Sequence, residues 1–580
     1  MKGRTGLKLT LTAIPLGVVV AFAGIGLLKL IHLITQLSFH GRFSFHESEP
    51  GFATFGWPAI FVPALGGLAI GLIARFGSPA IRGHGIPEAM QGVMTGGSRI
   101  PLKVAILKPL STALSIGTGG PFGAEGPIIA TGGAIGSLAG QWLPHSAAER
   151  KILLSAGAAA GMTAVFGTPL AGVLLAIELL LFEFRSRSLL PVAVAAGAAM
   201  AVRGMIGEAF PMLPLPSPDA PGPMLAVGSV VIGTVCGLAA VALTHTLHAI
   251  EHAYEKLPFH WMWWPAIGGL AVGLIGWIDP RTMGPGYGNL RALLDGGMLL
   301  PTLAALLVLK FLSWSICLGS GTAGGTLAPV MTIGGAVGAL TAHSLAGLPG
   351  FGGFPSGIAA LIGMAAIFAG ASRAFLTSVA FAFEATHSTT AFGPLLLGCA
   401  FAILVSKLLM KESIMTEKLA RSGVRVPEDY EPDPLHGGTV AALMIREPLV
   451  VGRKTTVREL GDLISTSSSR WSRARLFPII GDNRELLGVV SRADIFAAVQ
   501  ENPEPPVLEV AITHPITIHP DDSLAEAADR MILHEIGRLP VVDRSHPPRL
   551  CGIISRREIL EARRKKLEDE AHIAPRSPFA

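Results

Sequence analysis

Charged side chains are scarce in this chain of 580 residues, of which Asp, Glu, Lys and Arg make up only 15%. Apolar residues make up 50%, and the mean hydropathy is +0.55. A soluble globular protein of this size is not expected to be so apolar, so the composition predicts a membrane protein. The net charge of +5 is ordinary for such a protein and gives no indication of a nucleic-acid partner.

Cysteine is also rare, and the motifs of common enzymes are missing. The four cysteines stand far apart, at Cys236, Cys317, Cys399 and Cys551, so no spacing predicts a metal site or a disulfide framework. No HExxH zinc motif, nucleophile motif or cofactor fingerprint occurs. We therefore expect no enzyme activity, no metal and no required cofactor.

Long apolar runs are present instead, for example 9–28 and 223–243, and each is long enough to cross a bilayer. Lys2, Arg4 and Lys8 precede the first run, which lacks a clear small-x-small cleavage site. The run is therefore expected to remain as a first span with a cytoplasmic N-terminus. We predict a multi-pass protein of the inner (plasma) membrane of a prokaryote.

One long apolar segment occurs twice without a gap, at 107–136 and at 309–338. The register pairs Lys108 with Lys310 and Gly123 with Gly325, 202 residues apart. Duplicated membrane halves commonly place a substrate site where the two copies meet. The copies differ in charge at one position, where the first has Glu125 and the second Leu327.

Gly and Pro interrupt the apolar runs, which predicts helices that begin or end within the membrane. The interruptions lie at 83–87, 123–127, 166–169, 284–288 and 325–329. Backbone freed in this way is tolerated only where it is buried or lines a water-filled cavity. The N-terminus of a helix offers free N–H groups and a positive dipole end, so converging helix starts can hold an anion. The alternative is that these glycines only permit close helix packing.

Glu125 lies inside one of these interruptions. An ionisable group at membrane depth is costly and by default indicates function. A carboxylate beside an anion site competes with the anion for the same N–H groups, so protonation would release it. Glu125 is therefore predicted to be a gate, and the alternative is a paired structural carboxylate.

The apolar character ends near residue 410, and a duplicated α/β region follows, in which 486–499 matches 550–563 at an offset of 64. Short β-branched runs followed by helical patterns predict a β-α-β arrangement in each copy. The predicted organisation is a membrane domain at 1–420 with halves at about 9–210 and 223–420, a linker at 421–438, two α/β copies at 439–500 and 507–567, and a tail at 568–580.

The motifs GHGIPE (83–88), GAEGP (123–127), AAAGMTAVFGTPLAGVLLAIE (158–178), GSGTAGGTLAP (319–329) and GMAAIFAGASRAFLTSVAFAFE (363–384) resemble the CLC chloride channel and transporter family. The region after them resembles a CBS-domain pair. The resemblance implies an α-helical membrane fold built as an inverted repeat of broken, tilted helices, with a cytoplasmic α/β CBS pair. It also implies a homodimer in the lipid bilayer with one chloride pathway per subunit and both termini in the cytoplasm.

The resemblance also implies site residues. Glu125 corresponds to the gating glutamate, and the anion-binding residues would be His84, Gly85, Ile86, Gly123, Ala124, Gly126, Thr326, Leu327 and Met415. Three of these depart from the family pattern. His84 stands where a serine usually coordinates the anion, Met415 where a tyrosine is common, and Leu327 where phenylalanine is common.

A further departure bears on proton coupling. Coupled members of the family typically carry two consecutive acids where this chain has Glu178-Leu179, and leucine cannot relay a proton. This favours a passive, gated chloride channel. The alternative is an H⁺/Cl⁻ exchanger (antiporter) that uses Glu178, Glu183 or His84 with water. Structural pairing is the other interpretation of Glu178, which occupies a helix end comparable to that of Glu384.

In each α/β copy a serine precedes an acid by three residues, as Ser491 precedes Asp494 and Ser555 precedes Glu558. CBS pairs often bind a nucleotide ribose at this place, so these residues are candidates for an adenine nucleotide. The alternative is a capping box, which stabilises the start of a helix without a ligand.

A CBS-regulated channel for divalent cations is a function of a different class. Such a channel needs acidic side chains or carbonyl rings that face the pore. Glu125 and Glu178 are too few for this purpose, and Gly-rich helix starts favour anions.

Overall fold

The computed structural model describes residues 2–95, 97–143, 145–207, 211–215, 223–350, 354–424, 426, 435, 438–466 and 470–571. Its contacts form two compact units, the first ending at Val424 and the second covering Arg425–Ala571. Most of the expected linker at 421–438 lies outside the described residues, as do residues 572–580 of the expected tail.

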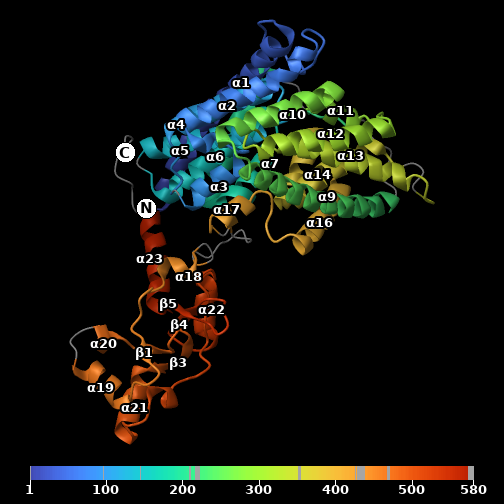
Figure 1. Cartoon of the computed structure of the whole chain (residues 1–580). Helices are drawn as coiled ribbons and strands as arrows, with labels where there is room; N and C mark the ends of the chain where they lie inside the picture. The colour runs from blue at the N-terminus through green and yellow to red at the C-terminus, as the bar shows by residue number, and fades with distance from the viewer. Residues whose placement is uncertain are drawn as a thin grey trace. The chain divides into compact units, whose positions relative to one another are not determined.

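The first unit is helical throughout (Figure 1). Its first half contains α1 (Lys2–Thr35), α2 (Val62–Phe76), α3 (Ile86–Met94), α4 (Leu102–Gly117), α5 (Glu125–Trp142), α6 (Ala147–Phe166), α7 (Pro169–Leu175) and α8 (Ser186–Ile206). Its second half contains α9 (Pro223–Glu255), α10 (Trp264–Ile278), α11 (Tyr287–Leu294), α12 (Leu300–Gly319), α13 (Leu327–Leu345), α14 (Ser356–Ser372), α15 (Phe375–Thr386), α16 (Phe392–Leu409) and α17 (Glu417–Arg421). Short turns of π-helix or 3₁₀-helix lie at Gln36–His40, Trp57–Phe61, Pro79–Ile81, Ala176–Leu181, Trp261–Trp263 and Pro280–Thr282.

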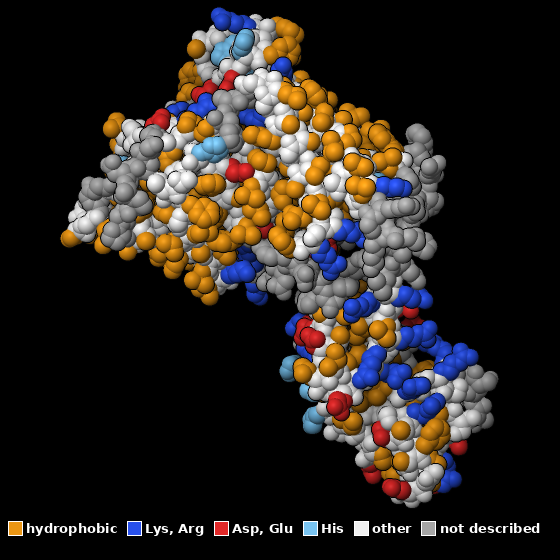
Figure 2. Space-filling model, turned by 180° about the vertical axis from the view of Figure 1, so that it is seen from behind, with side chains coloured by type: hydrophobic (Ala, Val, Ile, Leu, Met, Phe, Trp, Pro, Cys, Tyr) orange, Lys and Arg blue, Asp and Glu red, His pale blue; other side chains and the backbone are white. Residues whose placement is uncertain are grey.

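The long helices of this unit have the size and composition of membrane spans. Among the described residues, 7 helices are long and apolar enough to cross a bilayer, and several shorter apolar helices accompany them. Large hydrophobic side chains cover much of the visible face of this unit (Figure 2). Since lipid offers no penalty to such side chains, this surface agrees with a unit embedded in a membrane.

The two halves of the first unit meet through equivalent residues. Gly123 and Gly325 form an isolated antiparallel bridge, in which the Gly123 N–H donates to Gly325 O (3.1 Å) and the Gly325 N–H donates to Gly123 O (2.9 Å). Because the two residues are related by the repeat offset, this reciprocal pair marks an approximate twofold axis between the copies.

The helices α2 and α10 cross on the same axis. A Cβ at Gly67 would lie 2.1 Å from the Pro265 oxygen, and a Cβ at Gly269 would lie 2.2 Å from the Pro63 oxygen. Both pairs of equivalent residues differ by the same 202 positions as the segment at 107–136. Glycine therefore lets the two backbones approach at this crossing, as it does where membrane helices pack through small residues.

The second unit is an α/β structure. It contains the helices α18 (Val440–Leu443), α19 (Val457–Thr466), α20 (Arg470–Arg473), α21 (Arg492–Glu501), α22 (Leu524–Leu533) and α23 (Arg556–Ala571), a 3₁₀ turn at Val507–Val510, and the strands β1 (Val451–Gly452), β2 (Leu476–Ile480), β3 (Leu486–Ser491), β4 (Arg538–Val542) and β5 (Leu550–Ser555). In the first copy β1 pairs parallel with β2 and β2 pairs antiparallel with β3, while in the second β4 pairs antiparallel with β5.

The two copies of the second unit also meet through reciprocal hydrogen bonds. The Leu486 N–H donates to Pro548 O (2.9 Å), and the equivalent Leu550 N–H donates to Arg484 O (3.0 Å). Each copy packs a separate hydrophobic core around its own strands. Both units are thus pseudosymmetric pairs built around a backbone contact between equivalent residues.

Candidate functional site

Three helices begin close to the Gly123–Gly325 bridge. The helices α5 and α13 start two residues after these glycines. A Cβ at Gly126 would lie 2.1 Å from His84 O and 3.2 Å from Gly325 Cα, so the segment that leads into α3 reaches the same place. The free N–H groups and positive dipole ends of these helices therefore converge within the membrane unit.

The Glu125 side chain, which is 1% exposed, lies at this convergence. Its Oε1 accepts a hydrogen bond from the Tyr287 hydroxyl (3.2 Å). The N–H groups of Glu125 and Ala328 also face the carboxylate, although Oε2 completes no hydrogen bond of normal geometry. A Cβ at Gly123 would lie 1.7 Å from Oε2, so the carboxylate folds back onto the backbone of its own motif.

Tyr287 is held in place by its loop. Gly286 before it has a φ of +76°, which favours glycine, and helix α11 begins at the tyrosine itself. The buried Lys310 donates hydrogen bonds to Thr282 O (3.0 Å) and Gly284 O (2.9 Å), which hold the loop before α11 in place. The tyrosine ring packs edge-on against Phe166, with ring centroids 6.2 Å apart.

The equivalent lysine of the first copy does the same for the loop before α3. Lys108 is buried and donates to Ile81 O (2.9 Å) and Gly83 O (2.8 Å). Glu88 accepts from the Gly85 N–H (2.8 Å) and pairs with Lys418 of α17 (2.7 Å). The equivalent lysines of the two repeat copies, Lys108 and Lys310, thus anchor the two glycine loops that lead into α3 and α11.

Four other predicted anion-binding residues, His84, Thr326, Leu327 and Met415, bring no acidic or permanently charged side chain to the site. His84 is partly buried, and its Nδ1, an atom that is itself buried, has no hydrogen-bond partner among the described residues. Thr326 directly precedes α13 and Leu327 begins it, with exposed fractions of 3% and 4%. Met415 is 1% exposed and supplies no side-chain hydrogen bond, and its own N–H donates to Ser413 Oγ (3.2 Å).

Glu178 and Glu384 each accept hydrogen bonds from the start of the helix on which, or after which, the other lies. Glu178 accepts from the N–H groups of Leu376 (2.9 Å) and Thr377 (2.8 Å) at the start of α15. Glu384, within α15, accepts from the N–H groups of Leu170 (2.9 Å) and Ala171 (2.8 Å) at the start of α7. Each carboxylate therefore caps the other's helix.

The other two residues considered for proton transfer, Leu179 and Glu183, take no part in these helix-capping hydrogen bonds. Leu179 is 4% exposed and apolar. Glu183 accepts a hydrogen bond from the Ser188 hydroxyl and lies 3.9 Å from the Arg185 guanidinium.

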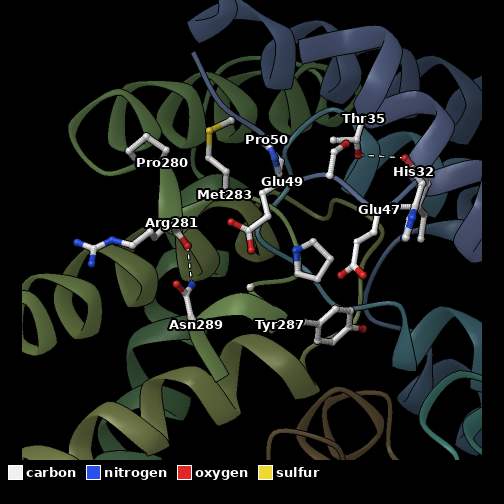
Figure 3. Close-up of a pocket in the computed structure, with 14 residues that line it drawn as sticks. His32, Thr35, Glu47, Glu49, Pro50, Pro280, Arg281, Met283, Tyr287 and Asn289 are labelled. Atoms are coloured by element: carbon white, nitrogen blue, oxygen red, sulfur yellow. Dashed lines mark hydrogen bonds between the residues drawn. The ribbon is translucent and has the colours of Figure 1, made fainter. Parts of the chain in front are cut away.

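Two cavities lie at different ends of the first unit. We call the first the Glu47 pocket; Glu47, Glu49, Arg281 and Tyr287 are among its lining residues, and the two carboxylates point toward the same space as the tyrosine (Figure 3). Its walls come from the segment after α1, drawn in dark blue at the top of Figure 1, and from the loop before α11.

We call the second cavity the Lys418 pocket. It has a volume of about 330 Å³ and is lined by residues including Arg82, Glu88, Arg99, Lys108 and Lys418. It adjoins α3 and α17, which lie at the bottom of the first unit in Figure 1. Its net charge is positive, so it is a suitable vestibule for anions.

In the second unit Ser491 and Asp494 form a capping box, while Ser555 and Glu558 are joined by two hydrogen bonds to the carboxylate. Ser491 Oγ accepts from the Asp494 N–H (3.2 Å), and Asp494 Oδ2 accepts from the Ser491 N–H (3.1 Å) at the start of α21. Glu558 accepts from the Ser555 N–H (2.9 Å) and from its hydroxyl at the start of α23. Within the described ranges, no group of three or more His, Cys, Asp or Glu side chains could hold a metal ion.

A duplicated helical membrane unit, whose copies meet at converging helix starts around one buried carboxylate, defines a polytopic membrane transport protein. The family model for the voltage gated chloride channel matches residues 65–407, and the CBS domain model matches 440–501 and 507–565. The chain therefore belongs to the CLC voltage-gated chloride channel family and carries a CBS-domain pair, as its motifs indicated.

Relatives of the chain carry the same family name. A putative chloride channel protein of Ralstonia nicotianae, described as ClcB-like, is 28% identical over 387 residues, which is 65% of this chain and 89% of that protein. The voltage-gated ClC-type chloride channel ClcB of Escherichia coli is 30% identical over 379 residues, 63% of this chain and 88% of that protein.

Solved structures have the same fold. A slow cyanobacterial Cl⁻/H⁺ antiporter matches with a TM-score of 0.64 at 24% identity, over 71% of this chain and 97% of that one. A eukaryotic CLC transporter matches with a TM-score of 0.63 at 20% identity, over 95% of this chain and 98% of that one. The predicted fold class, an α-helical CLC membrane unit followed by α/β CBS domains, is confirmed.

Sequence reasoning missed Tyr287 and the anchoring role of the two lysines. A signal was available, because GPGYG at 284–288 matches GHGIP at 83–87 with an offset of 201 instead of 202. The single-residue change in register concealed the match.

Proposed function

We propose that this protein conducts chloride or a similar small anion across the membrane, with Glu125 as the gate. The observation that supports this most directly is the position of the Glu125 carboxylate at the starts of α5 and α13. An anion would use the same N–H groups, so the carboxylate blocks the site when it is folded in and frees it when it leaves. CLC-type anion transport is the function of the family to which the chain belongs.

The proposed site holds its anion with backbone N–H groups and without a full positive charge. Gly85, Ile86, Gly123, Ala124 and Gly126 would contribute backbone from the first copy. Such binding is weak enough to permit release, which conduction requires. The buried Nδ1 of His84, which has no partner within the described part of the chain, supports a role for this imidazole as an additional donor in place of the usual serine hydroxyl.

Thr326 and Leu327 would contribute the backbone of the second copy. Met415 would line the inner end of the pathway without a hydroxyl, so this end is proposed to bind anions more weakly than in relatives that have a tyrosine.

We propose passive conduction in preference to proton exchange. Leu179 has no group that carries a proton, and Glu178 accepts three hydrogen bonds at the start of α15, from the N–H groups of Leu376 and Thr377 and from the Thr377 hydroxyl. Exchange is the second candidate, because two of the structures with this fold are described as a Cl⁻/H⁺ antiporter and a fluoride/proton antiporter. In that case His84 or Glu183 with water would carry the proton.

The reversal potential of the reconstituted protein distinguishes these two functions. With equal chloride on both sides of a bilayer and a pH gradient, a passive channel gives a reversal potential of zero. An exchanger gives a potential that changes sign with the gradient. The same liposomes test the divalent-cation alternative, since Mg²⁺ uptake without chloride efflux would overturn anion transport.

For the second unit, the capping geometry favours a structural role of Ser491, Asp494, Ser555 and Glu558, and adenine-nucleotide binding is the second candidate. Ribose hydroxyls would have to replace the capping contacts of a carboxylate. Titration of the full-length protein with ATP in a calorimeter tests this candidate, and Asp494→Ala is expected to abolish any heat of binding.

We also propose a homodimer with cytoplasmic termini. Chemical cross-linking in the membrane measures the first property. Labelling of a single cysteine placed near residue 580, in a variant without the four natural cysteines, measures the second.

A further inference from the structure

Two residues at which the repeat copies differ in chemistry contact each other. Glu125 of the first copy stands opposite Leu327 of the second in the repeat register. Tyr287, at the start of α11, stands where the first copy has Ile86 at the start of α3. At both positions one copy has a polar side chain where the other has an aliphatic one, and the Tyr287 hydroxyl donates to the Glu125 carboxylate at 3.2 Å.

The contacts of the Tyr287 hydroxyl orient its proton toward the Glu125 carboxylate. The Ala124 N–H faces the hydroxyl oxygen. Among the described residues, the side-chain acceptor for the hydroxyl proton is Glu125. A hydroxyl that accepts from a backbone N–H directs its own proton elsewhere, here to the carboxylate.

The ring itself cannot easily turn away. Phe166 packs edge-on against Tyr287 at 6.2 Å and against Phe381 at 5.3 Å, so the tyrosine belongs to a row of three aromatic rings. Its other side borders the Glu47 pocket (Figure 3). The tyrosine therefore separates this pocket from the gate.

We propose that Tyr287 is a positioning residue that latches the Glu125 gate. Its hydroxyl stabilises the ionised carboxylate in the blocking position, and the gate opens when protonation or an incoming anion breaks this hydrogen bond. The latch rests on the proposed function, since it has meaning only if Glu125 gates an anion pathway.

Other charged groups face the same region and remain in every variant below. Lys310 of α12 interacts electrostatically with Glu125, with Glu49 of the segment after α1 and with Asp279. Glu47, also after α1, faces Tyr287. Because these groups stay unchanged, a shifted pH response reports on the tyrosine hydroxyl.

The test measures chloride efflux from liposomes that contain the full-length protein, between about pH 5 and about pH 8. The variants are Tyr287→Phe, Tyr287→Met, Glu125→Ala and the double variant Glu125→Ala/Tyr287→Phe. Tyr254→Phe is the control, because Tyr254 is another tyrosine of the same unit and its ring lies against Trp264, with centroids 5.9 Å apart. Gel filtration establishes that each variant is folded.

Loss of one hydrogen bond to a charged group is expected to raise efflux at about pH 7.5 by roughly threefold to tenfold, and to move the midpoint of the pH response upward by about one unit. Tyr287→Met, which also lacks a donor, is expected to act in the same direction, and Tyr254→Phe to match the wild type. In the Glu125→Ala background the Tyr287→Phe change is expected to have no further effect, since a latch without its gate has nothing to hold.

Other outcomes overturn the latch. An unchanged pH response of Tyr287→Phe, or the same rise with and without Glu125, would show that the hydroxyl does not act through the gate. If only Tyr287→Met changes efflux, the ring and not the hydroxyl matters. Absence of chloride efflux from the wild type at every pH would overturn the proposed function itself, and the latch with it.

Discussion

At the scale of single residues, the proposed gating is a competition between two anions for one set of N–H groups. Glu125 is covalently attached and therefore present at high local concentration, whereas chloride arrives from solution. In this proposal, the incomplete hydrogen bonding of Oε2 among the described residues would weaken the hold on the carboxylate. Protonation removes its charge, so the balance between the two depends on pH.

Removal of the carboxylate should abolish this dependence. We expect Glu125→Ala to raise chloride efflux at about pH 8 by roughly tenfold and to make efflux the same at about pH 5, because no group remains to block the site. The matched control is Glu255→Gln, since Glu255 is an exposed carboxylate at the end of α9 that pairs with His252. A Glu125→Ala variant that still responds to pH like the wild type would show that another group is the gate.

A second residue makes the stability of the CBS pair depend on pH. Asp543 accepts hydrogen bonds from the Ser545 hydroxyl (2.6 Å) and the Arg549 N–H (2.8 Å), and these lower the pKa of its carboxyl below the usual value. A carboxyl with a lowered folded-state pKa stabilises the fold above its unfolded pKa and loses this contribution as the pH falls through the folded value.

We therefore expect peptides of β4 and β5 to exchange hydrogen faster as the pH falls below about 4, after correction for intrinsic exchange. Asp543→Asn should remove this change, whereas Asp482→Asn, at an exposed carboxylate without such donors, should keep it. Hydrogen exchange followed by mass spectrometry of the full-length protein measures both. Equal acid responses in the two variants would count against Asp543 as the group responsible.

The sequence predicted the residues that carry their own signal and missed those defined by contact. Glu125 stood out because a charge within an apolar repeat is conspicuous. Tyr287 was not assigned, since its partner is 162 residues away in the chain and only folding brings the two together. His84 and Met415 were singled out by departure from the family pattern, and their roles remain predictions.

At the scale of elements, the site depends on how closely α5 and α13 begin to each other. A Cβ at Gly325 would lie 2.5 Å from the Gly123 oxygen and 2.8 Å from Glu125 Oε2. Both contacts are too short for real atoms, so a side chain here must separate the two helix starts or displace the carboxylate.

We expect Gly325→Ala to lower chloride efflux by at least about tenfold, because the converging N–H groups would no longer face one point. Gly393→Ala is the control, as a Cβ at this helical glycine of α16 meets no atom within 4 Å. Efflux from liposomes and gel filtration of both variants provide the measurement. Normal efflux from Gly325→Ala would mean that the bridge between the copies is not needed for the pathway.

Element prediction from the sequence succeeded where the repeat is uninterrupted. The gapless match of 107–136 with 309–338 predicted the pairs α4 and α12, and α5 and α13. The match of α2 with α10 was missed although PALGGLAIGLI (63–73) and PAIGGLAVGLI (265–275) have the same offset. Their crossing depends on which glycines face a neighbour, which a single sequence does not state.

At the scale of the molecule, twofold pseudosymmetry predicts that equivalent residues contribute similarly to the stability of the fold. Lys108 and Lys310 occupy equivalent places and each satisfies buried carbonyl groups of the loop before a broken helix. Loss of either amine leaves those carbonyls unpaired in the interior, which costs about 1–3 kcal/mol for each group.

Lys108→Met and Lys310→Met should therefore lower the apparent Tm of the purified protein by similar amounts, about 5–10 °C. Lys407→Met, at an exposed lysine of α16, should leave it unchanged. Thermal unfolding monitored by gel filtration checks all three. A large effect of one lysine and none of the other would show that the copies have lost their structural equivalence.

The reciprocal bridge between Gly123 and Gly325 has a consequence for how such a gate can arise at all. Two separate, identical half-length chains that associated about this axis would place the same residue on both sides of it, either two carboxylates or none. Two ionised carboxylates at one point would repel each other and the anion. Joining the halves in one chain lets Glu125 stand where the other copy has Leu327, and Tyr287 where the other has Ile86, so the proposed gate needs only a single titratable group.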